Sequence, residues 1–99
     1  MTITIGKSSE NEVTITLGDT FDFNCVEEFR RVYESIEKGS KKIFVIDFSK
    51  TNYMDSSALG MLINMDRFWK GSVIRIVNSN PQLKKILIIS RFDKKFIIE

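Results

Sequence analysis

The sequence has no histidine, one cysteine and one proline among its 99 residues. Without histidine, the chain lacks the commonest general base of enzymes and the commonest metal ligand, so we expect a protein that is not an enzyme and holds no metal or cofactor. A single cysteine excludes an internal disulfide. This composition is typical of a reducing compartment, and we therefore expect a cytoplasmic location.

Long apolar runs and a strong net charge are also missing. No segment approaches the length that spans a bilayer, and the N-terminus lacks a signal-peptide pattern, so we expect no membrane insertion. The net charge is +2, from 15 basic and 13 acidic residues, and gives no broad reason to expect nucleic acid. Lys84-Lys85, Arg91 and Lys94-Lys95 make the C-terminal third locally basic, which we interpret as a solvated surface.

The composition, with 42% hydrophobic and 28% charged residues, is that of a globular protein, and the length predicts one domain over residues 1–99. Polar and apolar residues alternate over Thr2–Ile5 and Val13–Leu17, which predicts two strands joined as a hairpin by the turn-rich residues 6–11. Gly6-Lys7-Ser8 looks like the end of a phosphate-binding loop. That motif needs a glycine where Met1 stands and a helix where a hairpin is predicted, so we exclude it.

The first predicted helix follows a loop at residues 18–23. Asn24 is its predicted N-cap, and Glu27 stands three residues later in the capping-box position. Glu34 is spaced to pair with Lys38, and Gly39 is a good terminator. These residues predict a helix that begins after Asn24 and ends before Gly39.

Two further helices alternate with strands. Ile43–Phe48 is nearly continuously apolar, as a central strand is, and Ala58–Trp69 has helical spacing. Asn80-Pro81 predicts the start of the last helix, although the β-branched run Ile86–Ile89 leaves a strand open there. The remaining predicted strands are Val73–Val77 and Phe96–Ile98. The element order β-β-α-β-α-β-α-β predicts an α/β fold with a mixed sheet.

An acid and two hydroxyls, Asp55-Ser56-Ser57, stand where a buried strand gives way to a helix. Ligands of α/β sheets usually bind at such carboxyl ends of strands. Either serine needs a neighbouring base to act as a nucleophile, and no motif places one. Asp22, Asp47 and Asp55 could meet to hold magnesium, although nothing in their spacing requires it. We interpret Cys25 as a small core residue, not as a reactive thiol.

The same three residues also suit a modification site. A phosphate on a serine at a helix N-terminus adds about −2 charge where backbone N–H groups and the helix dipole tolerate it. Asp and Ser are equally ordinary N-cap residues, and a helix must begin here. Physical reasoning alone therefore leaves a simple helix start and a phosphorylation site as alternatives.

The stretch Tyr53–Gly60, preceded by Phe48-Ser49, resembles the signature of the STAS domain family, in particular bacterial anti-sigma factor antagonists. Gly18–Asn24 and Asn78–Pro81 resemble the loops before the first and third helices of that family. The resemblance implies a STAS-like mixed sheet with helices packed mainly on one face. Most members also carry a C-terminal helix, which this sequence lacks, and the exposed strip could support a weak homodimer.

The resemblance also implies a function. Such proteins take part in partner switching in signal transduction: they bind a serine kinase that is also an anti-sigma factor, and so regulate transcription. In the family's motif, the serine directly after the aspartate accepts phosphate, and this is Ser56, with Ser57 a less favoured acceptor. A serine phosphatase resets the phosphoprotein. The residues expected at the partner surface are Asp22, Phe23, Asn24, Tyr53, Asp55 and Ser57.

Alternatives remain at this point. STAS-like domains also serve as unphosphorylated regulatory or structural subunits of transporters and of biofilm or stress signalling assemblies. Nucleotide binding is a third possibility that no phosphate loop supports. Phe21 and Phe23 are equally good candidates to fill the core, and whichever does not is expected at the partner surface.

Overall fold

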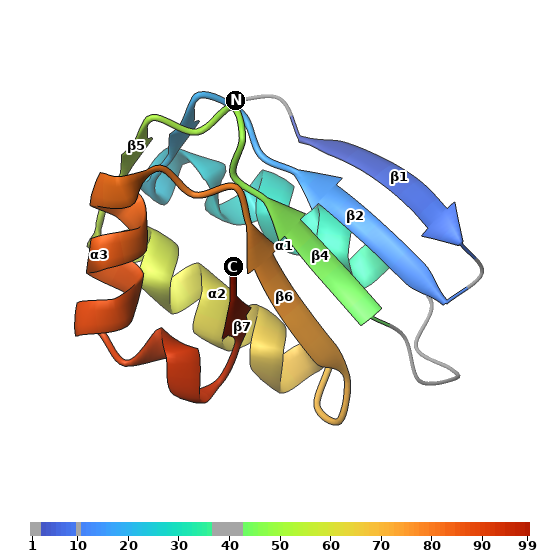
Figure 1. Ribbon diagram of the computed structural model, residues 1–99. Coiled ribbons are helices and arrows are strands. Elements are labelled where there is room, and N and C mark those ends of the chain that lie inside the picture. Colours follow the sequence, from blue (N-terminus) through green and yellow to red (C-terminus); the bar gives the residue numbers. More distant parts are fainter. Residues whose placement is uncertain (1–2, 10, 37–42) are drawn as a thin grey trace.

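The computed structural model describes residues 3–9, 11–36 and 43–99. Its main sheet has five strands in the order β1-β2-β4-β6-β7. Their bounds are β1 (Thr4–Ser9), β2 (Glu12–Thr16), β4 (Ile43–Asp47), β6 (Val73–Val77) and β7 (Ile97–Ile98). The β1–β2 pair is antiparallel and the other three pairs are parallel, so the predicted mixed sheet is confirmed (Figure 1).

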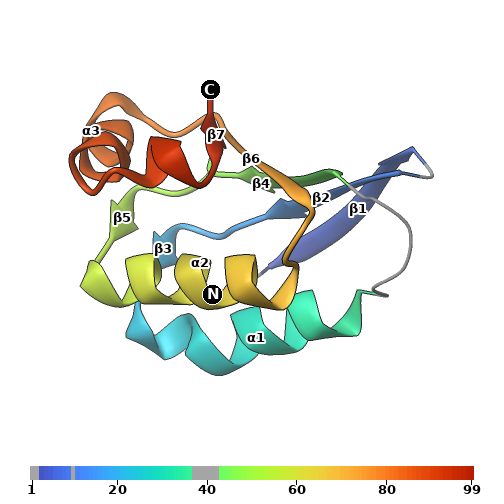
Figure 2. The same ribbon diagram turned by 90° about the horizontal axis from the view of Figure 1, so that it is seen from below.

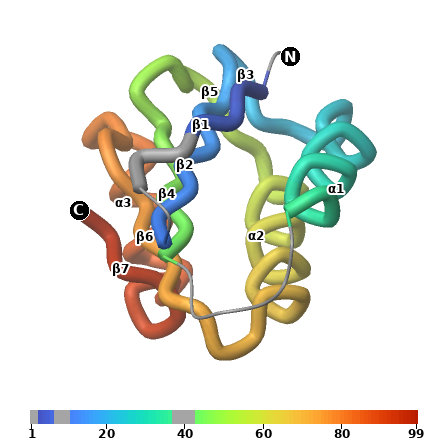
Figure 3. The backbone as a smooth tube through the Cα atoms, turned by 90° about the vertical axis from the view of Figure 1, so that its right-hand side faces the viewer, coloured from blue at the N-terminus to red at the C-terminus, as the bar shows by residue number. Residues whose placement is uncertain are grey.

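Among the described residues, three α-helices and two short 3-10 helices connect these strands. They are η1 (Phe23–Cys25), α1 (Val26–Ser35), α2 (Ser56–Phe68), α3 (Pro81–Ile89) and η2 (Phe92–Lys94). Figure 2 shows α1 and α2 together on one face of the sheet, as the resemblance implied. Figure 3 shows α3 away from these two helices, near β6 and β7.

The hydrophobic core fills the space between the sheet and α1 with α2. Alternate strand residues point into it, as on β2, where Val13 and Ile15 are buried and their neighbours are not. Trp69, just after α2, stacks on Phe44 of β4 with ring centroids 3.5 Å apart. The largest fully buried side chains are Phe21, Phe29, Phe48, Ile15, Leu17, Ile46, Leu62, Met65, Ile76 and Leu87.

The first hairpin differs from its prediction. The pairing of β1 with β2 continues to Ser9 opposite Glu12, so the residues expected in a broad turn extend the strand instead. Strand pairing uses main-chain groups, and polar residues at a sheet edge do not end it. Lys38 and Gly39 lie outside the described residues, so the pairing of Glu34 with Lys38 and the terminator Gly39 stay predictions.

The third helix follows its prediction closely. Asn80 is its N-cap, and its Oδ1 accepts a hydrogen bond from the Leu83 N–H at 2.8 Å. Leu83 and Leu87 are buried, and Ile86 is half-buried against the core. Residues 81–89 are therefore helical, as the capping signal of Asn80-Pro81 predicts, and the alternative of a strand over the β-branched run is wrong.

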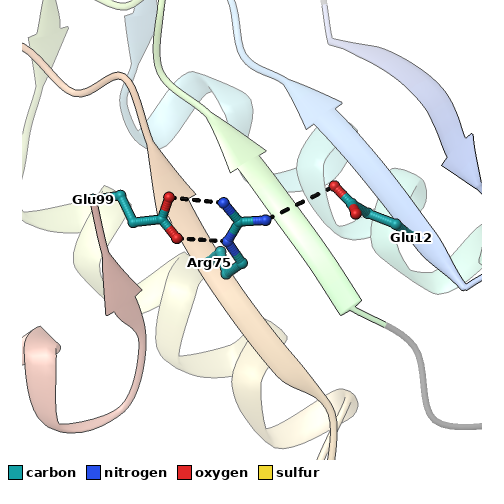
Figure 4. Close-up of polar contacts among 3 residues, drawn as sticks. All are labelled: Glu12, Arg75 and Glu99. Carbon is teal, nitrogen blue, oxygen red and sulfur yellow. Dashed lines mark hydrogen bonds and ion pairs between the residues drawn. The ribbon is translucent and has the colours of Figure 1, made fainter.

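The face of the sheet opposite α1 and α2 carries a charged cluster. Arg75 on β6 donates from Nε and Nη2 to the two carboxylate oxygens of Glu99, at 2.6 and 2.7 Å. Its Nη1 lies 3.9 Å from Oε1 of Glu12 on β2 (Figure 4). Val45 of β4 is in register with Arg75 and only 6% exposed, so we infer that the arginine side chain covers it.

Candidate functional site

Two very short strands bring the predicted site segments together. β3 (Thr20–Phe21) pairs in parallel with β5 (Tyr53–Met54) as a separate two-stranded sheet, with Thr20 opposite Tyr53. Figures 1 and 2 show this pair beyond the ends of the main strands. The loop before α1 therefore lies directly beside the segment that leads into α2.

Side chains that the sequence analysis did not single out hold these two segments together. Thr51 is 2% exposed, and its hydroxyl donates to the carbonyl of Gly18 at 2.8 Å. The side-chain amide of Asn52 donates to Asp19 Oδ1 at 2.7 Å, and the main-chain N–H of Asn52 donates to the Asp19 carbonyl at 2.8 Å. The partners are 33 residues apart in the chain, so no local pattern could have paired them.

Asp55 begins α2. Its Oδ1 accepts hydrogen bonds from the N–H groups of Ser57 at 2.9 Å and Ala58 at 3.3 Å, and the Ala58 N–H also donates to the Asp55 carbonyl at 3.1 Å, so Asp55 satisfies two donors of the first turn. The helix therefore begins at Ser56, two residues before the predicted start. Ser56 occupies the first helical position and is exposed, whereas Ser57 is half-buried.

The helix on the other side of the site begins differently from its prediction. Asp22, not Asn24, is the capping residue: its Oδ1 accepts a hydrogen bond from the Asn24 N–H at 3.0 Å and opens the 3-10 helix η1. α1 begins only at Val26, and its N-cap residue Cys25 makes no side-chain cap. The aspartate two residues earlier binds the N–H of Asn24 first, so the chain turns tightly before it becomes α-helical.

The two phenylalanines of the loop have opposite roles. Phe21 is fully buried and packs edge-on against Phe29 and Phe48, with ring centroids 5.0 and 6.1 Å away. Phe23 is 64% exposed, and Tyr53 on the adjoining strand is 54% exposed. Phe21 therefore fills the core, and the exposed aromatics beside the start of α2 are Phe23 and Tyr53.

The aspartates considered for magnesium are used locally instead. Asp22, Asp47 and Asp55 each accept a hydrogen bond from the N–H group two residues further on, at 2.9 to 3.0 Å. Within residues 3–9, 11–36 and 43–99, no group of three or more acids and cysteines is arranged to hold a metal ion. Burial would raise the pKa of Asp47, but hydrogen bonds from Asn78 and Ser49 outweigh it and lower the pKa.

Cys25 is a core residue, as expected. It is 2% exposed, and its Sγ lies 3.6 Å from the carbonyl oxygen of Thr20 and 3.7 Å from Asp22 Oδ1. Burial, aided by the neighbouring carboxylate, raises the pKa of this thiol above its ordinary value. A raised pKa keeps the sulfur in the unreactive thiol form.

A comparison with protein families now identifies the fold. The family model described as the STAS domain matches residues 6–99. The chain belongs to the STAS domain family. A STAS-domain containing protein of Pseudomonas aeruginosa (strain UCBPP-PA14) is 37% identical over 101 residues, covering 99% of this chain and 99% of the relative.

Solved structures agree with this STAS assignment at the level of the fold. The anti-sigma factor antagonist SpoIIAA in its unphosphorylated form has a TM-score of 0.75 at 20% identity, covering 99% of this chain and 87% of that one. The phosphorylated form of SpoIIAA, a Bacillus cell fate determinant, has a TM-score of 0.70 at 19% identity, with coverage of 99% and 91%. A sulfate transporter family protein from Wolinella succinogenes has a TM-score of 0.73 at 14% identity, with coverage of 90% and 78%.

The helices of this STAS domain are short. α2, the longest among the described residues, has 13 residues. In the part of the chain that the structure describes, no helix combines the length and apolar character that crossing a membrane requires.

Proposed function

We propose that this STAS domain is a phosphorylation-controlled interaction switch of the anti-sigma factor antagonist type. It binds a serine kinase that is also an anti-sigma factor while Ser56 is unmodified. Phosphorylation of Ser56 releases the complex, and a serine phosphatase restores the binding form. The domain acts in the cytoplasm by binding and not by catalysis.

The position of Ser56 is the observation that carries this proposal. Ser56 is exposed at the first position of α2, and the carboxylate of Asp55 caps the helix beside it. The helix start therefore does not need the Ser56 hydroxyl as its capping acceptor, and a kinase can reach it. The solved relative SpoIIAA, which has unphosphorylated and phosphorylated forms, supports the same kind of control here.

The surroundings of Ser56 support a protein partner. Asp22, Phe23 and Asn24 come from one side of the β3–β5 pair, and Tyr53, Asp55 and Ser57 come from the other. Exposed aromatic side chains such as Phe23 and Tyr53 are enriched at protein interfaces. A phosphate would add about −2 charge at the centre of this surface, where a neighbouring aspartate already stands, and would repel a packed partner.

The first experiment asks whether Ser56 is the acceptor. The protein is purified from its natural host, with and without phosphatase treatment, and phosphate is mapped by mass spectrometry. We expect a phosphatase-sensitive phosphate on Ser56, absent from the Ser56→Ala variant. Phosphate found only outside Ser56 and Ser57 would contradict the proposal.

The second experiment asks whether the modification controls binding. A partner captured by the wild-type protein is tested against Ser56→Ala and Ser56→Asp, and Ser72→Asp is the control for added charge elsewhere. We expect Ser56→Ala and Ser72→Asp to keep the partner and Ser56→Asp to lose it. Equal binding by Ser56→Ala and Ser56→Asp would contradict the switch and would mean that Ser56 only begins the helix.

A second candidate function is an unphosphorylated regulatory or structural STAS subunit of a transporter or a biofilm or stress signalling assembly. The structural similarity to the sulfate transporter family protein from Wolinella succinogenes favours this alternative. It predicts a constant partner and no phosphate on Ser56 in any growth condition. The mass measurement above therefore separates the two functions.

A further inference from the structure

The outer face of α3 exposes two large aliphatic side chains. Leu83 and Leu87 point into the core at 2% and 0% exposure, whereas Ile88 and Ile89 are 43% and 69% exposed. Burying such side chains is favourable, so two neighbouring isoleucines exposed on one helix form a small apolar patch that another surface can cover.

Two lysines accompany these isoleucines. Lys84 and Lys85 are both exposed, and they precede Ile88 and Ile89 by four residues. Residues four apart lie one above the other on a helix, so lysine and isoleucine form two adjacent rows on the outer face of α3. Lysine stems lie along apolar surface while their ammonium groups extend to a polar layer.

The segment after α3 adds three more cations. Phe92 and Phe96 are buried, with ring centroids 5.5 Å apart, and they fix η2 against the core. Arg91, Lys94 and Lys95 are all exposed around these anchors. Figure 2 shows α3 and η2 together at the periphery of the molecule, away from α1. We call this surface of α3 and η2 the basic isoleucine face.

The charge of the molecule is divided unevenly. Residues 81–95 contain five cations and one acid, Asp93, for a net charge of +4, whereas the whole chain has +2. The rest of the chain therefore sums to −2. Within the described residues, the five cations make no ion pair, because the salt bridges there all involve Arg75. The basic isoleucine face thus has unneutralised charge to offer to an anionic surface.

We propose that the basic isoleucine face binds peripherally to a membrane surface rich in anionic lipid. Ile88 and Ile89 enter the boundary between headgroups and acyl chains, and the five cations pair with lipid phosphates around them. α3 lies flat in this arrangement, since its nine residues are too few to span a bilayer. A fluid lipid surface fits this outward-facing helix surface, because it adapts to spaced cations and aliphatic tips without a matching groove.

This inference does not depend on the proposed switch. The basic isoleucine face comes from α3 and η2, whereas Ser56 and its surroundings come from β3, β5 and α2. Variants of one surface leave the residues of the other unchanged. A failure of lipid binding therefore leaves the phosphorylation proposal as it stands, and the reverse also holds.

The test is vesicle co-sedimentation of the full chain. Phosphatidylcholine vesicles are compared with vesicles that also contain phosphatidylglycerol, at low and high salt. We expect binding only to the anionic vesicles, with loss at high salt because screening weakens it. Lys84→Gln with Lys85→Gln lowers the partition coefficient about thirtyfold, and Ile88→Ser with Ile89→Ser lowers it by about tenfold or more.

A matched control uses another exposed pair of cations on a helix. Arg30→Gln with Arg31→Gln changes α1 by the same charge and is expected to leave vesicle binding unchanged. Circular dichroism checks that each variant is folded. Binding that is absent from anionic vesicles, or that the α1 variant lowers equally, would overturn the proposal. Retention on a polyglutamate resin with none on vesicles would also overturn it and assign the face to an acidic protein.

Discussion

Asp22 and Asp55 at the candidate site are used differently from the acids on the face of the sheet opposite α1 and α2, which we call the open face. At the site, Asp22 and Asp55 accept hydrogen bonds from N–H groups two residues further along the chain, at 3.0 and 2.9 Å. On the open face, Glu12 and Glu99 reach Arg75 on another strand, at 3.9 and 2.6 Å. The first kind of contact shapes a short piece of chain, and the second kind joins distant pieces.

The two regions therefore depend on different parts of the chain. Because Asp55 binds N–H groups of its own helix, the start of α2 is capped from within the chain, and Ser56 is exposed beside it. On the open face, each change to Arg75 or Glu99 acts on the contact between β6 and β7. The start of α2 therefore depends on contacts within a few residues, whereas the open face depends on contacts between strands.

The largest expected effect concerns the buried ring of Phe21, which anchors the loop before α1 in the core through contacts with distant residues. Phe21→Ala should lower the free energy of unfolding by about 3–5 kcal/mol, because it removes a fully buried ring between Phe29 and Phe48. Phe23→Ala, in the same loop but exposed, should change it by less than about 0.5 kcal/mol. Urea unfolding measures both, and similar losses would contradict the division of roles between the two rings.

The second test removes the local contact itself. Asp55→Ala should lower the free energy of unfolding by about 1 kcal/mol, since the Ser57 N–H loses its acceptor and the Ala58 N–H keeps only the main-chain carbonyl of residue 55. Asp55→Asn keeps a capping oxygen and should stay close to wild type. If thermal unfolding shows equal losses for both variants, the charge of Asp55 matters more than its hydrogen bonds.

Most of the local contacts were predictable from the sequence. The cap at Asn80, the acid before Ser56 and the burial of Cys25 all follow from patterns within a few residues, and the structure has them. The prediction failed at Asn24 for a local reason of its own. Asp22 binds the N–H of Asn24 and starts a 3-10 turn, and a capping-box pattern does not show which of two nearby acceptors binds first.

Contacts between distant residues were not predictable from the sequence. The pairing of β3 with β5 involves two residues in each strand, too few for any alternation to appear. Composition treats Phe21 and Phe23 alike, and only the fold decides which ring meets Phe29. The bridge from Arg75 to Glu12 and Glu99 likewise depends on strand order, which hydrophobic patterns do not specify.

The third test concerns a residue near the site that the fold does not require. Gly60 lies in α2 one turn after Ser56, and a Cβ there meets nothing within 4 Å. Gly60→Ala should therefore raise the free energy of unfolding, by up to about 1 kcal/mol. Gly71→Ala is the matched control and should lower it, because Gly71 has a φ of +93°. A loss of stability in Gly60→Ala would show that a side chain is not tolerated at this position and would contradict the open space around Gly60.

The smallest expected effect sharpens the account of the open face. Hydrogen bonds from Arg75, and its positive charge, lower the pKa of Glu99, so this carboxylate stabilises the folded form above its ordinary pKa and loses that effect as the pH falls through the lowered value. Glu99→Gln should be slightly less stable than wild type at neutral pH and equal to it in strong acid. Urea unfolding across acidic pH measures this. Arg75→Met should remove the same part of the pH dependence, and adding Glu99→Gln to it should change nothing further. A wild-type pH dependence in Glu99→Gln would mean that the bridge between β6 and β7 contributes no stability, and the two regions would then differ in geometry alone.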